Sequence, residues 1–160
     1  MYRKPVSGIM LILLTLSMLT FAFNIQPIKV EGSSYIEVRQ SGFTQVSGLI
    51  TQNTTWTADA SPYVVVGDVC VDISVFLTIK PGVTVEFTNE TNLIVDGCLI
   101  ARGNSTNRIT FTSNNTNPAS GNWGGINIRH YSVGGNIFEY TLVEYSSTAL
   151  VLAADCSITD

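Results

Sequence analysis

The stretch LTIKPGVTVEF, Leu77 to Phe87, decides the fold of this chain. It contains two short segments in which apolar and polar residues alternate, and Pro81-Gly82 joins them. Two-residue β-hairpins prefer Asn-Gly or Gly-X in type I′ or II′ turns, whereas Pro followed by Gly favours a type II turn, which splays the flanking strands. The stretch therefore predicts a corner between two strands of different sheets, and not an antiparallel hairpin.

Short motifs recur on both sides of this corner with a common spacing of 24 residues. VCVD at Val69–Asp72 resembles LIVD at Leu93–Asp96, and VEFT at Val85–Thr88 resembles ITFT at Ile109–Thr112. A looser echo, FEYT followed by VEYS, begins at Phe138. Repeats of this length indicate a solenoid in which each unit is one coil.

The alternation also predicts which side chains point inward, because alternate residues of a strand share a face. Stacked coils would bring the apolar face of each strand into one column, where each fully buried side chain contributes ~1.5–3 kcal/mol. One coil cannot bury its own inner face, so several must stack. The residues predicted to point inward are Val69, Val71, Val83, Val85, Phe87, Leu93, Val95, Ile109 and Phe111.

The composition favours a nearly all-β protein. Only 12% of the 160 residues are charged, and Thr, Val, Ile, Phe and Tyr are typical of strands. The formal net charge is −4, and becomes about −7 if residues 1–30 are removed. The remaining basic residues are scattered singly, which argues against a nucleic-acid partner, whose phosphates need clustered Lys and Arg.

These segments resemble the N-terminal part of secreted prokaryotic right-handed parallel β-helix proteins of the pectin-lyase-like superfamily. The resemblance runs from about Ser47 to the end, and its most specific pieces are ITQNTTWTADASPYVVVGDV, LTIKPGVTVEF, LIVDGCLIARG, NRITFTS and NWGGI. It implies an all-β chain with three parallel sheets around a narrow apolar core. It implies less about activity, since the superfamily includes both enzymes and non-catalytic surface proteins.

The resemblance and the hydropathy together divide the chain into three parts. Tyr2–Lys4 gives a positive start, and the apolar run Ile9–Phe23 is shorter than the roughly 20 residues of a membrane span. We therefore predict a signal peptide over residues 1–30, with an uncleaved anchor as the alternative. Residues 31–62 are expected to form an N-terminal capping region, and residues 63–160 the β-helix coils.

The last stretch, ALVLAADCSITD at Ala149–Asp160, stops in mid-pattern. We expect it to continue into further coils of a longer protein or of a partner, because an uncapped β-helix exposes a sheet edge. The alternative is that this stretch is itself a final short coil.

The three cysteines, Cys70, Cys98 and Cys156, form no CxxC pair, and with a single histidine they lack the spacing of a zinc site. We interpret them as small core or surface residues. The alternative is a Cys70–Cys98 disulfide, because export permits such bonds, although the two residues are predicted to lie off the inner column at different places along the coil.

No catalytic or metal-binding cluster is predicted, and no cofactor. In pectate-lyase relatives an Arg is the base and carboxylates hold calcium, which requires several acidic groups on one face. Here Arg129 stands beside His130, the only histidine, which we interpret as a surface or loop residue. Glu139 and Glu144 are predicted to face opposite sides of a strand.

Candidate binding and modification sites lie in polar, turn-rich segments. Trp123 and Arg129 are the candidate carbohydrate-binding residues, because an exposed Trp can stack on a sugar ring. The alternative for the tryptophans is a structural role, with Trp56 covering the open top of the core and Trp123 supporting the loop into Ile126. Four sequons near predicted turns are candidate N-glycosylation sites, namely those at Asn53, Asn89, Asn104 and Asn114.

The predicted function is an exported cell-surface or extracellular scaffold or adhesion-type module with no catalysis in this segment. Its expected partners are polysaccharide or cell-envelope components. The membrane is expected to be reached only through the export signal or a C-terminal anchor beyond Asp160. The alternative is the N-terminal fragment of a polysaccharide lyase or glycoside hydrolase whose active site lies in later coils.

Overall fold

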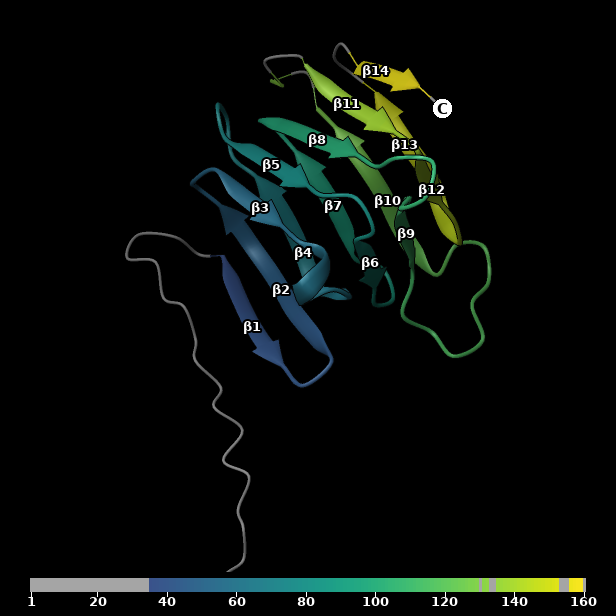
Figure 1. The fold of residues 1–160 in the computed structure, drawn as a ribbon. Coiled ribbons are helices and arrows are strands. Elements are labelled where there is room, and N and C mark those ends of the chain that lie inside the picture. The colour runs from purple at the N-terminus through teal and green to yellow at the C-terminus, as the bar shows by residue number, and fades with distance from the viewer. Residues whose placement is uncertain (1–34, 130, 133–134, 153–155, 160) are drawn as a thin grey trace, which may run out of the picture.

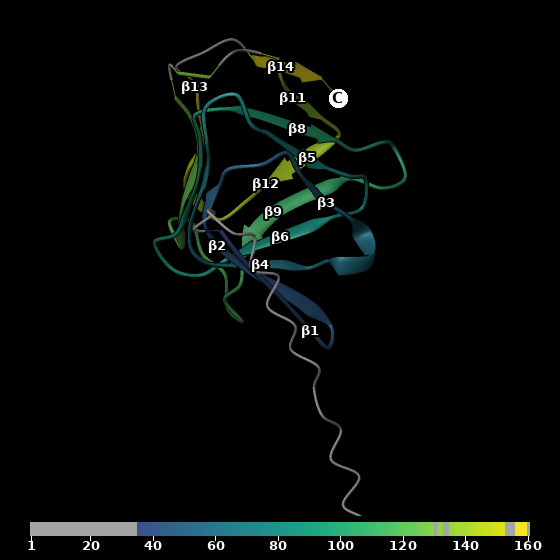
Figure 2. The same cartoon turned by 90° about the vertical axis from the view of Figure 1, so that its left-hand side faces the viewer.

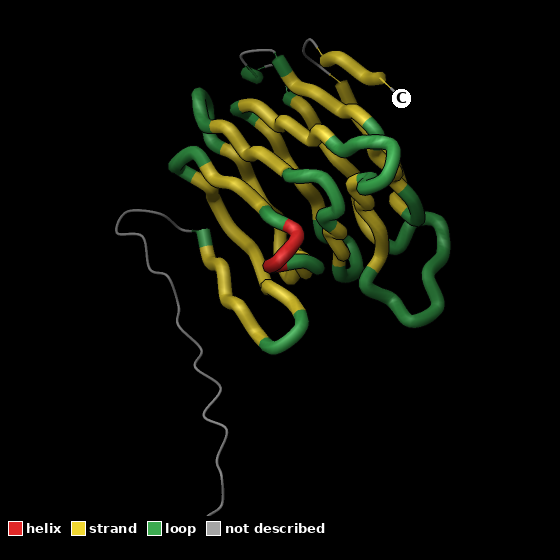
Figure 3. Tube along the Cα trace, viewed as in Figure 1, coloured by secondary structure: helices red, strands yellow, loops and turns green. Residues whose placement is uncertain are grey.

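The computed structural model describes residues 35–129, 131–132, 135–152 and 156–159, whose regular structure is almost entirely β-strand, with loops and turns between the strands (Figure 3). The exception is η1, a single 3-10 turn at Ala58–Ala60. None of the described residues forms a helix that could cross a membrane. The strands are β1 (Ile36–Gln40), β2 (Phe43–Ile50), β3 (Thr54–Trp56), β4 (Tyr63–Val71), β5 (Phe76–Ile79), β6 (Thr84–Phe87), β7 (Asn92–Val95), β8 (Cys98–Arg102), β9 (Ile109–Ser113), β10 (Trp123–Ile128), β11 (Asn136–Glu139), β12 (Thr141–Val143), β13 (Ser146–Leu152) and β14 (Cys156–Thr159).

The strands wind around a common core as stacked coils (Figures 1 and 2). A five-stranded parallel sheet has the order β14-β11-β8-β5-β3, and a nine-stranded sheet contains the path β12-β9-β6-β4-β7-β10-β13. The long strand β4 joins two parts of the larger sheet, because its first half pairs with β6 and its second half with β7. One coil is therefore β6, β7 and β8, followed by β9, β10 and β11. The predicted all-β, parallel β-helix class is confirmed.

The corner at Pro81-Gly82 has the predicted geometry. β5 before it belongs to the five-stranded sheet, whereas β6 after it belongs to the nine-stranded sheet. Gly82 has a φ of +82°, in the left-handed region that the third residue of a type II turn requires. Its backbone N–H donates to the carbonyl of Asn107 in the next coil, at 3.2 Å. The two halves of the opening stretch therefore each pair with neighbouring coils.

The register of stacking agrees with the 24-residue spacing on one side of the coil and differs on another. Val69 pairs with Leu93 as predicted. Val85, however, pairs with Phe111 and not with Ile109, which makes the offset 26 residues there. The extra length lies in the loop after β8, where Asn104 Oδ1 accepts hydrogen bonds from the backbone N–H groups of Thr106 and Asn107 in a compact turn.

All nine residues predicted to point inward are fully buried, and they belong to one continuous core. Large aromatic rings add to this column. Trp56 stacks on Tyr63 with ring centroids 4.7 Å apart at the N-terminal end, and Phe87 stacks on Trp123 at 3.9 Å further along. The apolar column that stabilises the coils is therefore the one indicated by the alternation in the sequence.

The stack of coils begins earlier than residue 63. β1 pairs antiparallel with β2, but β2 already pairs in parallel with β4. The predicted capping region 31–62 thus contains two strands, β2 and β3, that pair in parallel with strands of the coils, in addition to β1. The predicted signal peptide, residues 1–30, lies outside the described residues.

At the other end, the pattern continues through one more coil. β12 pairs with β9, β13 with β10, and β14 with β11, all in parallel. Of the stretch from Ala149 onward, residues 149–152 lie in β13 and Cys156–Thr159 form β14, within a coil that begins at β12.

Candidate functional site

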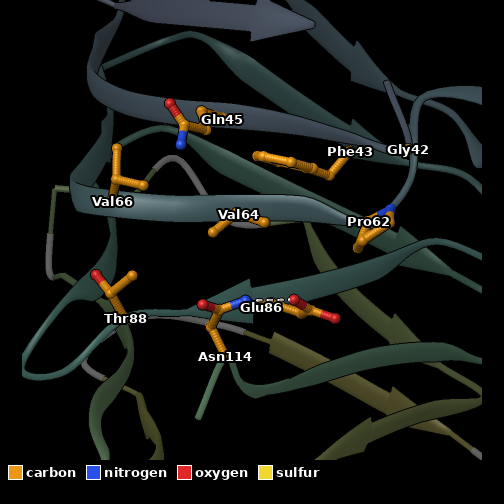
Figure 4. Close-up of a pocket in the computed structure, with 9 residues that line it drawn as sticks. All are labelled: Gly42, Phe43, Gln45, Pro62, Val64, Val66, Glu86, Thr88 and Asn114. Atoms are coloured by element: carbon orange, nitrogen blue, oxygen red, sulfur yellow. Dashed lines mark hydrogen bonds between the residues drawn. The ribbon is translucent and has the colours of Figure 1, made fainter. Parts of the chain in front are cut away.

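A shallow groove of about 350 Å³ lies on the outer face of the nine-stranded sheet, across β2, β4, β6 and the residue after β9 (Figure 4). We call it the outer groove. It is lined by Gly42, Phe43, Gln45, Pro62, Val64, Val66, Glu86, Thr88 and Asn114.

The strand alternation positions the lining residues. Gln45 pairs with Val64, and Val64 pairs with Glu86 on the next strand. Their neighbours in sequence, such as Val65 and Phe87, are fully buried. Because side chains alternate between the two faces of a strand, the lining residues project outward while these neighbours fill the core.

One end of the groove is apolar. Phe43 is half-buried, Val64 is almost covered, and Val66 is 45% exposed. Figure 4 shows the Phe43 ring beside β2 and the two valines on β4. The unbroken apolar run Tyr63–Val66 thus places apolar side chains on both faces of β4, so the groove has an apolar floor.

The other end is polar and rich in amides. Asn114 Nδ2 donates to Glu86 Oε2 at 2.6 Å, and this pair is visible in Figure 4. An adjoining hollow of about 410 Å³ shares Thr88 and Asn114 with the groove and is also lined by Asn89 and Asn115. Asn115 Nδ2 donates to Asn89 Oδ1 at 2.9 Å. The combined surface therefore changes from apolar to amide-lined over its length.

A third hollow of about 150 Å³ adjoins the apolar end, sharing Gly42 and Phe43 with the groove. It contains Arg39, whose guanidinium nitrogens lie 3.7 Å from Asp59 Oδ2 and 3.8 Å from Glu37 Oε1. Hydrogen bonding by the Thr57 side chain, with a smaller effect of Arg39, lowers the pKa of Asp59. The cation here thus has two nearby carboxylates.

Trp123 does not occupy the exposed position required of a sugar-binding residue. It is fully buried, stacks on Phe87, and donates from Nε1 to the backbone carbonyl of Glu144 at 2.9 Å. The prediction that Trp123 presents its ring to a carbohydrate is wrong, because the residue begins β10 and points into the core. Its structural alternative is the one the packing supports, and Trp56 likewise is fully buried at the N-terminal end.

Arg129 follows β10 and is partly exposed, with Nη1 3.3 Å from Asp96 Oδ2. The other oxygen of Asp96 is buried and has no hydrogen-bond partner among the described residues. β10 belongs to the part of the sheet that pairs with β7 and β13, away from the outer groove. The structure therefore does not bring Arg129 and Trp123 together as one exposed site. His130 lies outside the described residues.

The four sequon asparagines differ in their surroundings. Asn53, Asn89 and Asn114 are exposed, and Asn104 is half-buried. Asn53 Oδ1 accepts a hydrogen bond from the backbone N–H of Phe76 at 2.9 Å. Asn114 lines the outer groove and Asn89 lines the hollow beside it. A glycan on either of these two would cover part of the groove.

No metal site stands out, since the residues that the structure describes include no group of three or more His, Cys, Asp or Glu placed to hold an ion. Glu139 lies on β11 of the five-stranded sheet and pairs with Arg102 at 2.7 Å. Glu144 instead accepts a hydrogen bond from Thr112 on the nine-stranded sheet. The two carboxylates are therefore separated by the corner between β11 and β12, and do not lie on opposite sides of one strand as predicted.

The alternative of a Cys70–Cys98 disulfide is wrong. Cys70 is half-exposed on β4 and Cys98 is buried at the start of β8, and the two are not joined. The two strands lie in different sheets, which separates the thiols. Burial raises the pKa of the Cys70 thiol. The side chain of Cys156 lies outside what the structure describes.

The sequence interpretation missed the outer groove and its residues. Phe43 precedes the part of the chain that carries the resemblance, and the other lining residues are the outward members of alternating strands. One signal was present in the unbroken run Tyr63–Val66, where strict alternation would place a polar residue on the outer face. Valines at successive positions place apolar side chains on both faces of that strand, with Val65 pointing inward and Val64 and Val66 outward.

The comparison with protein families agrees with this architecture. The family described as pectate-lyase-like β-helix domain matches residues 48–134, which is more than half of the chain. The chain therefore belongs to the pectate-lyase-like β-helix domain family. No curated protein and no solved structure gives a significant match to it.

Proposed function

We propose that this protein is an exported β-helix module that binds polysaccharide in the outer groove, at the cell surface or outside the cell, without catalysis in this segment. The observation that carries the proposal is the apolar floor at Phe43, Val64 and Val66 beside the hydrogen-bonded Glu86–Asn114 pair. Membership of the pectate-lyase-like family supports a carbohydrate-related role.

The groove has the two features that sugar recognition needs. Sugar rings have apolar C–H faces, which pack on aromatic and aliphatic side chains, and a rim of hydroxyl groups that both donate and accept hydrogen bonds. Gln45 and Asn114 carry amides that do both, and Glu86 accepts. A ligand site of this kind combines mostly apolar lining with a few placed polar groups.

The dimensions suit a chain of sugars more than a single one. The groove crosses β2, β4, β6 and the residue after β9, and neighbouring strands lie about 4.8 Å apart. Three such intervals span about 14 Å along the stack. An extended polysaccharide lying across the strands could place successive rings over the apolar and amide-lined ends.

Export is supported by the sequence: the positive start, the apolar run Ile9–Phe23 and the low charge of the remainder.

The glycosylation proposal competes with the binding proposal at two positions. Glycans at Asn89 or Asn114 would cover the groove, whereas Asn53 and Asn104 lie outside its lining. Glycosylation at Asn53 and Asn104 alone is therefore compatible with binding.

The second candidate is the N-terminal part of a polysaccharide lyase or glycoside hydrolase, and the family match favours it. The direct test incubates the full-length protein with pectate and related glycans in the presence of Ca²⁺. Formation of unsaturated product that absorbs in the ultraviolet would favour this candidate over the non-catalytic module.

The binding proposal is tested by substituting Phe43, the aromatic residue in the lining of the groove. Phe43→Ala removes a ring whose stacking contribution is about 1 kcal/mol, so affinity for soluble polysaccharide should fall about five-fold or more. Phe76→Ala is the matched control, because Phe76 is 39% exposed on β5, away from the groove. Affinity gel electrophoresis measures both, and circular dichroism checks that each variant is folded. Unchanged binding by folded Phe43→Ala would contradict the proposal.

A further inference from the structure

The charge in the lining of the outer groove is negative. Glu86 is the charged residue among the side chains that line it, and no Lys or Arg occurs in that lining. Along the same outward row, Glu86 pairs with Thr112, whose Oγ1 donates to Glu144 Oε1 at 3.1 Å. This row therefore carries carboxylates on β6 and directly after β12.

The described basic residues do not offset this charge. Arg39 adjoins the apolar end but faces the carboxylates of Asp59 and Glu37. Arg102 pairs with Glu139, and Arg129 pairs with Asp96. Lys80 follows β5 at the corner, and Arg108 precedes β9, so neither lines the groove. A ligand in the groove thus meets a negative potential.

Hydrogen-bond chemistry points the same way. The carboxylate of Glu86 only accepts hydrogen bonds. It can therefore bind a sugar hydroxyl but not a sugar carboxylate, which also only accepts. Two like unit charges about 4 Å apart repel each other enough to weaken binding about five-fold even in water, and more where water is excluded. A polymer of uronic acids would therefore meet repulsion at Glu86 without a cation to balance it.

We infer that the outer groove selects neutral polysaccharides over polyuronates, although the family takes its description from pectate. This inference rests on the proposed function, and it identifies the class of glycan that the groove accepts. The amide groups of Gln45 and Asn114 match a hydroxyl rim, and the carboxylate of Glu86 adds selection against anionic chains.

The test uses pairs of polysaccharides that share a backbone and differ in charge. One pair is fully methyl-esterified and de-esterified homogalacturonan, and the other is a neutral soluble β-glucan and its carboxymethylated form. Where a pair binds, titration calorimetry at low ionic strength should show that its neutral member binds more tightly than its acidic member. Raising the salt concentration should improve binding of the acidic member and leave the neutral member unchanged, because salt screens exposed charges.

Glu86→Gln makes the test specific to the groove. Removing this charge should raise the ratio of affinity for the acidic member to affinity for the neutral member about five-fold. Asp68→Asn is the control, because it changes net charge equally at an exposed position on the other half of β4. An equal gain in both variants would show a non-specific charge effect and would overturn the inference.

The outcomes separate this inference from the proposed function. Acidic members that bind as tightly as their neutral partners, or more tightly, would overturn the inference while the polysaccharide-binding proposal stands. If no member of either pair binds, both the inference and the proposed function fail.

Discussion

Two tyrosines and a tryptophan close the N-terminal end of the core. Trp56 stacks on Tyr63 and donates from Nε1 to the hydroxyl of Tyr35 at 3.0 Å. The Tyr63 hydroxyl accepts a hydrogen bond from the backbone N–H of Thr57 at 3.0 Å. Burial raises the pKa of Tyr35, with a further contribution from Glu37, and burial also raises the pKa of Tyr63.

These shifts predict a loss of stability in alkali. In the unfolded chain both phenols lose their protons near pH 10, whereas the folded protein keeps them. The unfolded state then binds fewer protons than the folded state, so the free energy of unfolding falls as pH rises above about 10. Urea unfolding measured between pH 8 and pH 11.5 should show this decline. The double variant Tyr35→Phe/Tyr63→Phe should lose much of the dependence, and an equally steep decline in that variant would argue against the explanation.

Trp123 illustrates what single residues conceal in the sequence. Its neighbours Asn122 and Gly124 are typical of a loop, and an exposed ring was a reasonable expectation from them. In the fold, Trp123 is the first residue of β10, and its ring stacks on Phe87 of the preceding coil. The partner lies 36 positions away, so no local pattern could reveal it.

At the scale of the element, the corner at Pro81-Gly82 sets the direction of the chain. Gly82 has a φ of +82°, which costs an L-residue with a side chain roughly 1–2 kcal/mol. A Cβ at this position would meet only ordinary contacts, the nearest being Asn107 Cβ at 3.7 Å. The cost of a substitution here is therefore conformational and not steric.

Gly82→Ala should accordingly lower the free energy of unfolding by about 1–2 kcal/mol without altering the fold. Gly67→Ala is the matched control, because Gly67 does not have a positive φ and its nearest neighbour would be Ser47 Cβ at 3.5 Å. This control should be neutral or slightly stabilising. Chemical denaturation of both variants measures the difference, and equal stabilities would contradict the proposed role of the corner.

The elements of this fold could be predicted from the sequence because they follow from local alternation and turn chemistry. The inward residues, the corner and the pairing of Val69 with Leu93 all have local signals. The two-residue change of register at Val85 has no local signal in the sequence, because it depends on how the compact turn at Asn104 accommodates the extra residues. The candidate groove was missed for a related reason. Its residues become neighbours only through pairing between coils, and outward positions carry weak hydropathy signals.

At the scale of the whole molecule, the groove is a product of stacking. No single coil contains it, since Phe43, Val64 and Glu86 come from three successive strands of the stack. Binding of a polysaccharide to this surface is a proposal separate from the β-helix fold, which the strand pairing and the family match support.

The most direct test of polysaccharide binding is to map the ligand on the folded protein by NMR. Backbone amide shifts should be recorded during titration with a neutral soluble polysaccharide fragment. If the polysaccharide binds in the outer groove, the perturbed amides should cluster on β2, the first half of β4, β6 and the residues after β9. Perturbations centred on the five-stranded sheet of β3, β5, β8 and β11, or on Arg129, would contradict it.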